Sequence, residues 1–219
     1  MSDIKIELID SMGDDLRVSN VARVSFDRWK EEFDQKDVSL INYLAAHEHT
    51  SPFRHTAITV RCKAPVFIAR QLGKHQAGLS WNEVSRRYVD VGIEFFSPDS
   101  WRSRPVDGMK QGSGEDVDAI KTALIDEAYE VHLDECMKLY DGMIDLGVAP
   151  EQARMVLPQS MMVDWVWTGN LFAFYHVYRL RIDGHAQKEA QEFAQKLGTI
   201  LEDLFPHCMK ALKNDSAKN

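Results

Sequence analysis

The sequence predicts an α+β fold, in which helices flank a mixed or antiparallel sheet within a single domain spanning residues 1–219. Three observations lead to this prediction. Short segments with alternating apolar residues indicate strands, and other segments carry apolar residues at helical spacing. The two kinds of segment do not alternate regularly, so a doubly wound parallel sheet is not expected. One helical pattern, at about 115–146, is much longer than the others.

Three segments are predicted to be strands. Residues 4–9 alternate at their start, residues 57–62 (AITVRC) combine alternation with β-branched side chains, and residues 161–168 are apolar. Apolar residues three and four positions apart predict a helix within 37–49. Pro65 suits the first turn of another helix, which continues through the apolar stretch PVFIARQL.

The long helix is predicted to follow a loop rich in proline and glycine at 98–115. Ser113 and Asp116, three residues apart, resemble a capping box that would begin this helix. Gly147 and Pro150 are expected to end it, because glycine and proline commonly follow the last turn of a helix.

The C-terminal part of the chain is predicted to be mainly helical. Helices are expected at 151–157, 170–181 and 186–204, and the last of these has one strongly apolar face. Pro206 is expected to stop that helix, since proline cannot continue it. The residues at 213–219 are expected to fray.

The composition limits the classes of function. The net charge of −8 disfavours nucleic acid and anionic membrane surfaces as partners. Three cysteines without a CxxC pair indicate a reducing compartment rather than a disulfide framework. The chain shows no apolar run of membrane-spanning length and no signal-peptide pattern at its start, so we expect a cytoplasmic protein.

The stretch at 70–88, RQLGKHQAGLSWNEVSRRY, gathers basic and polar residues within an acidic protein. Ser85 and Arg87 are residue types that bind phosphate, through a hydroxyl and a guanidinium fork. Gln71 and His75 are four residues apart, so a helix would place both on one face. A run of charges more often only faces water, and the chain contains neither GxGxxG nor a P-loop. Composition alone therefore does not decide the role of this stretch.

The order of residues in this stretch resembles the signature of the flavin-dependent thymidylate synthases, RHRxxSxNExSxRY. The NExSxRY half is intact from Asn82 to Tyr88. Other parts of the chain resemble further blocks of that family, in the family's order: ARVSFD at 22–27, HxHxSPFxH at 47–55, KAPVFIARQ at 63–71, ARMVLP at 153–158 and LRIDGHAQ at 180–187. The resemblance covers nearly the whole chain.

The chain departs from the family pattern mainly at the RHR triplet, which reads Lys74-His75-Gln76. One extra residue follows it, around 77–79, and Arg54 stands where the family often has glutamate. Lysine keeps the charge of arginine but loses its bidentate fork, and glutamine loses the charge. These departures concern the expected flavin and folate contacts more than the nucleotide site.

The resemblance implies the reductive methylation of dUMP to dTMP. It implies FAD as cofactor, with 5,10-methylenetetrahydrofolate and NADPH as co-substrates, and a homotetramer whose sites are shared between subunits. The residues that match dUMP-binding positions are Gln71, Glu83, Val84, Ser85, Arg86, Arg87, Arg154 and Arg181. Those that match FAD-binding positions are Ser51, Lys74, His75, Gln76, Glu83, Asn170 and His185, and His49 matches a position near flavin and folate.

Arg181 is the catalytic residue that the resemblance implies. A cation facing the uracil ring would stabilise negative charge that develops on the pyrimidine. Arg181 and His185 are four residues apart, so we expect them on one face of one helix. None of the three cysteines lies within the matched motifs, which suits a reaction that needs no cysteine nucleophile because reduced FAD supplies the hydride.

Two alternatives stay open at this point. The altered KHQ triplet and its insertion could leave a nucleotide-binding protein of the same fold without flavin turnover. The histidines His47, His49 and His55 could instead serve a metal-dependent nucleotide hydrolase. Their spacing matches no strong zinc pattern, so no metal is expected.

Overall fold

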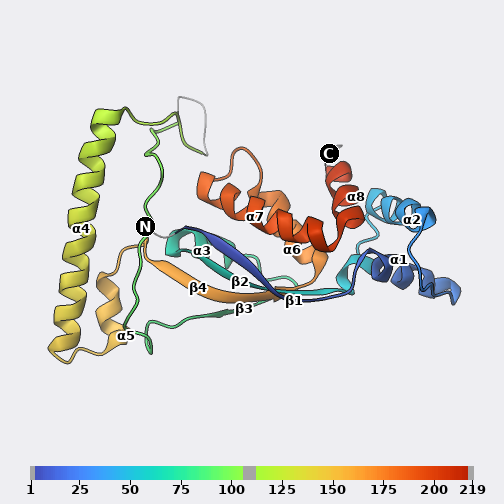
Figure 1. The fold of residues 1–219 in the computed structure, drawn as a ribbon, viewed down its shortest axis with the longest axis horizontal. Helices are drawn as coiled ribbons and strands as arrows, with labels where there is room; N and C mark the ends of the chain where they lie inside the picture. Colours follow the sequence, from blue (N-terminus) through green and yellow to red (C-terminus); the bar gives the residue numbers. More distant parts are fainter. Residues whose placement is uncertain (1–2, 106–111, 217–219) are drawn as a thin grey trace.

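The computed structural model describes residues 3–105 and 112–216, and it has an α+β architecture (Figure 1). Its strands form one antiparallel sheet in the order β1-β2-β4-β3, which confirms the predicted fold class. The strands are β1 (Lys5–Met12), β2 (Ala57–Pro65), β3 (Leu79–Glu83) and β4 (Met162–Gly169).

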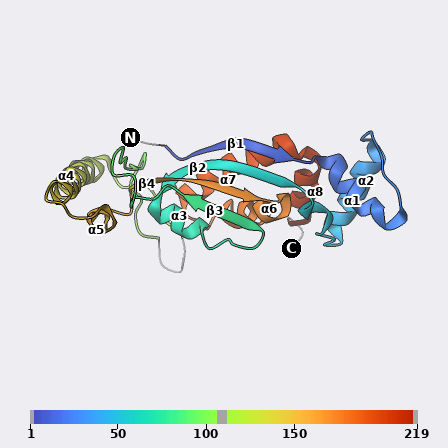
Figure 2. The same ribbon diagram turned by 90° about the horizontal axis from the view of Figure 1, so that it is seen from below.

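The helices occupy three places around this sheet (Figures 1 and 2). One face is covered by α6 (Leu171–Arg181) and α7 (Lys188–Leu204), and α3 (Val66–Leu72) follows β2 directly. At one end of the molecule lie α1 (Asp15–Arg23), α2 (Gln35–Ala46) and α8 (Pro206–Ser216). At the other end, α4 (Ala119–Asp145) stands apart from the sheet beside α5 (Pro150–Ala153).

The alternation within β2 and β4 produces the core. Val60 and Cys62 pair with Trp167 and Trp165, and all four are buried on the helix-covered face. The ring of Trp165 stacks on Phe193 of α7, with centroids 5.9 Å apart. Large aromatic side chains contribute much buried apolar area, so this contact fixes α7 on the sheet.

The start of α4 differs from the prediction. The helix begins at Ala119, and its N-cap is Asp118, whose carboxylate accepts a hydrogen bond from the backbone N–H of Lys121 at 3.1 Å. Ser113 does not cap a helix, because its hydroxyl accepts a hydrogen bond from Nε of Arg102 at 2.8 Å. The capping box expected at Ser113 and Asp116 is therefore wrong.

Helix α7 ends at Leu204, before Pro206 as predicted, but this proline also begins a further helix, α8, which was not predicted. Proline suits the first turn of a helix. The buried carboxylate of Asp15 accepts hydrogen bonds from the backbone N–H groups of His207 and Cys208, each at 2.9 Å, and so satisfies two donors of that turn. The expected frayed segment at 213–219 is helical as far as Ser216, and the rest lies outside the described residues.

Candidate active site

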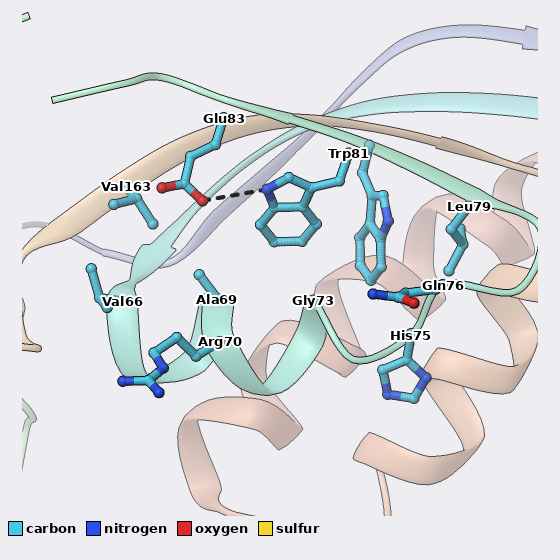
Figure 3. Close-up of a pocket in the computed structure, with 11 residues that line it drawn as sticks. Val66, Ala69, Arg70, Gly73, His75, Gln76, Leu79, Trp81, Glu83 and Val163 are labelled. Carbon is cyan, nitrogen blue, oxygen red and sulfur yellow. Dashed lines mark hydrogen bonds between the residues drawn. The ribbon is translucent and has the colours of Figure 1, made fainter. Parts of the chain in front are cut away.

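The chain turns sharply after α3, and this turn opens a cavity beneath the sheet edge. The helix ends at Leu72, Gly73 caps it, and the N–H of His75 donates to the carbonyl of Leu72 at 2.9 Å before β3 begins. The resulting space, which we call the α3 cavity, has a volume of about 570 Å³ (Figure 3). Its walls are Val66, Ala69, Arg70, Gly73, His75, Gln76, Leu79, Trp81, Glu83, Val163 and Trp167.

The third strand supplies one wall of the α3 cavity, and it is not among the strands predicted from the sequence. Leu79, Trp81 and Glu83 alternate with exposed residues and so share one side of the strand. Trp81 stacks on Trp165 with centroids 4.2 Å apart. Its indole N–H donates to Oε2 of Glu83 at 3.3 Å, as Figure 3 shows. The alternation Leu79-Trp81-Glu83 was the available signal for this wall.

A second cavity, of about 550 Å³, lies beside the first, and Glu83 lines both. We call it the Arg154 cavity. It gathers most of the residues expected to bind dUMP, which come from the end of β3, the segment after it and the turn after α5: Glu83, Val84, Ser85, Arg86, Arg87 and Arg154. The other walls are Val66, Leu157, Pro158, Gln159, Met161 and Val163.

Two of these residues have groups already engaged within the chain. The guanidinium of Arg86 donates to the backbone carbonyls of residues 89, 91 and 92, at 3.4, 2.7 and 3.3 Å. The backbone N–H of Val84 donates to the carbonyl of Asp164 at 2.8 Å. These contacts hold the chain after β3 in place, so Arg86 and Val84 shape the cavity wall.

The other cations of the Arg154 cavity retain donors for a ligand. Arg87 donates from Nε to the hydroxyl of Ser85 at 3.3 Å, and Arg154 donates from Nε to the carbonyl of Glu151 at 3.2 Å. An arginine has five N–H donors, so most of each guanidinium is left for other contacts. Burial raises the pKa of Glu83, and the indole of Trp81 and the charge of Arg154 oppose this effect.

Arg181 and His75 meet although 106 residues separate them in the chain. Arg181 is the last residue of α6, and it donates from Nε and Nη2 to Nε2 of His75, at 3.1 and 3.0 Å. Burial, then the charges of Arg181 and His176, lower the pKa of His75 to about 4. The imidazole is therefore neutral at pH 7.

Two expectations based on helical spacing are wrong. Gln71 and His75 do not share a helix face, because α3 ends at Leu72. Arg181 and His185 do not either, because α6 ends at Arg181. His185 lies in the following loop, where its backbone N–H donates to Asp183 at 2.8 Å. Within the described residues, the buried Oε1 atom of Gln71 has no hydrogen-bond partner.

Three other residues expected at a flavin lie in the turn after α3 and at the start of α6. Gln76 lines the α3 cavity, and Lys74 is exposed in the same turn. Asn170 caps α6 by accepting the N–H of Ala173 at 2.9 Å. Its amide lies against Gly78, whose φ is +75° and where an added Cβ would lie 3.0 Å from Nδ2 of Asn170. Glycine is therefore needed at this turn.

Seven of the expected residues line neither of these cavities: Ser51, His49, His185, Lys74, Asn170, Gln71 and Arg181. Ser51 precedes a short 3-10 turn at Pro52–Arg54, and the ring of His49 lies 5.9 Å from that of Tyr43 and 6.2 Å from that of His47. Arg70 lines the α3 cavity but was not assigned to binding, although it begins the basic stretch that pointed to this region.

The described residues bring no three His, Cys, Asp or Glu side chains together as a group that could hold a metal ion. The histidines His47, His49 and His55 therefore form no such group. In the same part of the chain, no helix is both long and apolar enough to cross a membrane.

Comparison with known proteins identifies the family. The family model described as thymidylate synthase complementing protein matches residues 7–207. A flavin-dependent thymidylate synthase of Thermosipho africanus is 36% identical over 206 residues, which make up 94% of this chain and 89% of that protein. The chain belongs to the flavin-dependent thymidylate synthase family. Another member, from Thermus thermophilus, is 33% identical over 92% of this chain and 72% of its own length.

Comparison with solved structures extends to the fold. A UMP/dUMP methylase, PolB from Streptomyces cacaoi, bound with 5-Br dUMP, superposes with a TM-score of 0.87 at 31% identity. The match covers 97% of this chain and 96% of that one. The same methylase bound with 5-Br UMP gives a TM-score of 0.88 at 29% identity. The antiparallel sheet and its helices are thus arranged as in that methylase.

Proposed function

We propose that this family member methylates dUMP to dTMP, with 5,10-methylenetetrahydrofolate as carbon donor and NADPH as reductant through FAD. The single observation that carries the proposal is the Arg154 cavity. It gathers Ser85, Arg87 and Arg154 and shares Glu83 with the α3 cavity. Pockets of this size accommodate small-molecule ligands.

The nucleotide would be held by charge and by hydrogen bonds. Arg87 and Arg154 suit its phosphate, because a guanidinium fork matches phosphate oxygens in pairs. Ser85 lies beside Arg87 and adds a hydroxyl. Arg181 would face the uracil ring and stabilise the negative charge that develops there during the reaction.

The residues at the α3 cavity fit a flavin. The cavity has an aromatic and aliphatic wall with Trp81 and Leu79, and a polar wall with Arg70, His75 and Gln76. FAD, when bound, supplies the hydride for the methyl group. The side chains of His75, Gln76 and Asn170 would orient it, together with Lys74, Ser51 and His185.

We also propose that the protein assembles as a homotetramer with sites shared between subunits. Helix α4 supports this proposal, because it stands apart from the sheet (Figure 1) and carries exposed apolar side chains along one face. Ile120, Leu124 and Val131 are 77, 63 and 54% exposed. Exposed apolar stripes of this kind mark interaction surfaces. The helix is tied to its own chain by Tyr129, which donates to the carbonyl of Phe96 at 2.7 Å.

Replacing Leu124 and Val131 together by lysine is expected to break this assembly. Two charges within the stripe would have to be buried without partners, which is costly. Sedimentation should then report a mass near the 25.1 kDa of one chain, or near that of a dimer, instead of a tetramer. Glu130→Lys, on the exposed flank of the same helix, should leave the wild-type mass. An unchanged tetramer in the double variant would rule out α4 as the interface.

The proposed reaction is tested with the wild-type protein. Purified protein should show flavin absorption, and NADPH should bleach it. Formation of dTMP should require dUMP, methylenetetrahydrofolate and NADPH together. UMP should be assayed in parallel, because the solved relative is named a UMP/dUMP methylase. Protein that binds dUMP but neither takes up FAD nor oxidises NADPH would support the alternative of a nucleotide-binding protein instead.

A further inference from the structure

The contact between His75 and Arg181 has an unusual hydrogen-bond pattern. Two N–H groups of one guanidinium, from Nε and Nη2, converge on the single acceptor Nε2 of His75. Both side chains are partly buried, and the two residues come from different elements. A neutral imidazole with its proton on Nδ1 is the form that offers Nε2 as an acceptor.

The surroundings of His75 keep it in this form. Burial, the charge of Arg181 and the nearby His176 all disfavour the imidazolium, and the ring of His176 lies 5.9 Å from that of His75. A protonated His75 would present an N–H to the guanidinium in place of an acceptor. The neutral ring thus offers Arg181 the acceptor that its two N–H groups need.

The contact also determines how Arg181 can meet a ligand. The guanidinium is planar, and His75 occupies the edge formed by Nε and one terminal nitrogen. The opposite edge keeps its donors for another group. Arginine side chains have many rotamers, so an arginine held on one edge loses less freedom when a ligand binds the other.

From this geometry we propose that His75 is a positioning residue, which holds the guanidinium of Arg181 in the orientation that contacts the pyrimidine. This inference rests on the proposed function, and it gives His75 a role beyond the expected flavin contact. The sharp turn after Leu72 makes this contact possible, because it carries His75 off α3 and toward the end of α6. A residue that continued α3 would not reach Arg181.

A double-mutant cycle tests the proposal. His75→Leu removes the acceptor, Arg181→Ala removes its partner, and the double variant removes both. With FAD at saturation, His75→Leu should lower turnover by about tenfold, because a small misplacement of a catalytic group has a large effect. In the Arg181→Ala background the same change should cost less than about twofold, since coupled residues are not additive. Equal effects in both backgrounds would overturn the proposal.

The variant His75→Gln distinguishes a role of His75 in positioning Arg181 from a role in packing alone. The glutamine amide oxygen reaches about as far as Nε2 and offers an acceptor, so turnover should return to within about threefold of the wild type. FAD affinity is measured for each variant, so that loss of flavin is not mistaken for loss of position. A glutamine variant as impaired as His75→Leu, with FAD bound, would contradict the proposal.

The affinity for dUMP, measured by calorimetry without turnover, provides a second readout of the cycle. His75→Leu should weaken dUMP binding in the wild-type background and have little effect once Arg181 is alanine. A wild type that binds dUMP but makes no dTMP would contradict only the proposed reaction. The coupling between His75 and Arg181 would still be measured from the dUMP affinities of the variants. A wild type that binds no dUMP would overturn both.

Discussion

Replacing Arg181 by alanine is expected to lower the rate of dTMP formation by about 100-fold or more, with the fold intact. Removing a preorganised donor that faces developing charge typically costs this much, about 2.7 kcal/mol or more of transition-state stabilisation. Arg181 is only partly buried at the end of α6, so its loss should not unfold the protein. Steady-state turnover with all three substrates at saturation is the measurement.

Two further variants make this result specific. Arg181→Lys keeps the charge but loses the fork, so its turnover should lie between those of the wild type and the alanine variant. Arg179→Ala removes an exposed arginine from the same helix and should change turnover by less than about threefold. Near-normal turnover of Arg181→Ala would show that the role given to this residue is incorrect.

Local patterns in the sequence were sufficient for most of the fold. Strand β2 follows from alternation and β-branched side chains, β4 from its apolar residues, and α7 from its apolar face. The start of α8 could not be predicted in this way. Pro206 can follow one helix or begin another, and Asp15, which caps α8, lies 193 residues from Cys208 in the chain. The choice depends on a tertiary contact.

In the candidate site, too, local patterns predict some features and tertiary contacts determine the others. Residues close together in the motif, such as Ser85 and Arg87, also lie together in the structure, and Arg154 joins them. The predictions from residue spacing were wrong where they required a helix to continue. His75 is four residues from Gln71 and His185 is four from Arg181, but a helix ends within each interval. The pairing of His75 with Arg181 depends on where those helices end, which residue spacing does not encode.

Replacing Asp37 by asparagine is expected to lower the free energy of unfolding by about 3 kcal/mol at pH 7. The carboxylate is fully buried, and it accepts hydrogen bonds from Ser19 at 2.8 Å and Lys30 at 2.6 Å, and another from Arg23. It joins α1, the segment after it and α2. Breaking a buried charge pair typically costs about 3–5 kcal/mol, and the partial exposure of Lys30 favours the lower end.

The effect of this substitution should depend on pH. Burial alone would raise the pKa of Asp37, but hydrogen bonds from Lys30, the backbone of Asp34, Ser19 and Arg23 outweigh it and hold the pKa well below its ordinary value of 3.8. A carboxyl with a depressed folded-state pKa stabilises the fold above its unfolded-state pKa. That stabilisation is lost as the pH falls below about 4 toward the lower folded-state value.

Urea unfolding at fixed protein concentration measures both effects, since assembly would make stability depend on concentration. The difference between wild type and Asp37→Asn should be about 3 kcal/mol at pH 7 and smaller at pH 3. Glu192→Gln, which removes a charge from an exposed pair with Lys196 on α7, should change stability by less than about 0.5 kcal/mol. A loss below about 1 kcal/mol for Asp37→Asn, or one equal at both pH values, would show that this buried carboxylate does not hold α1 and α2 together through its charge.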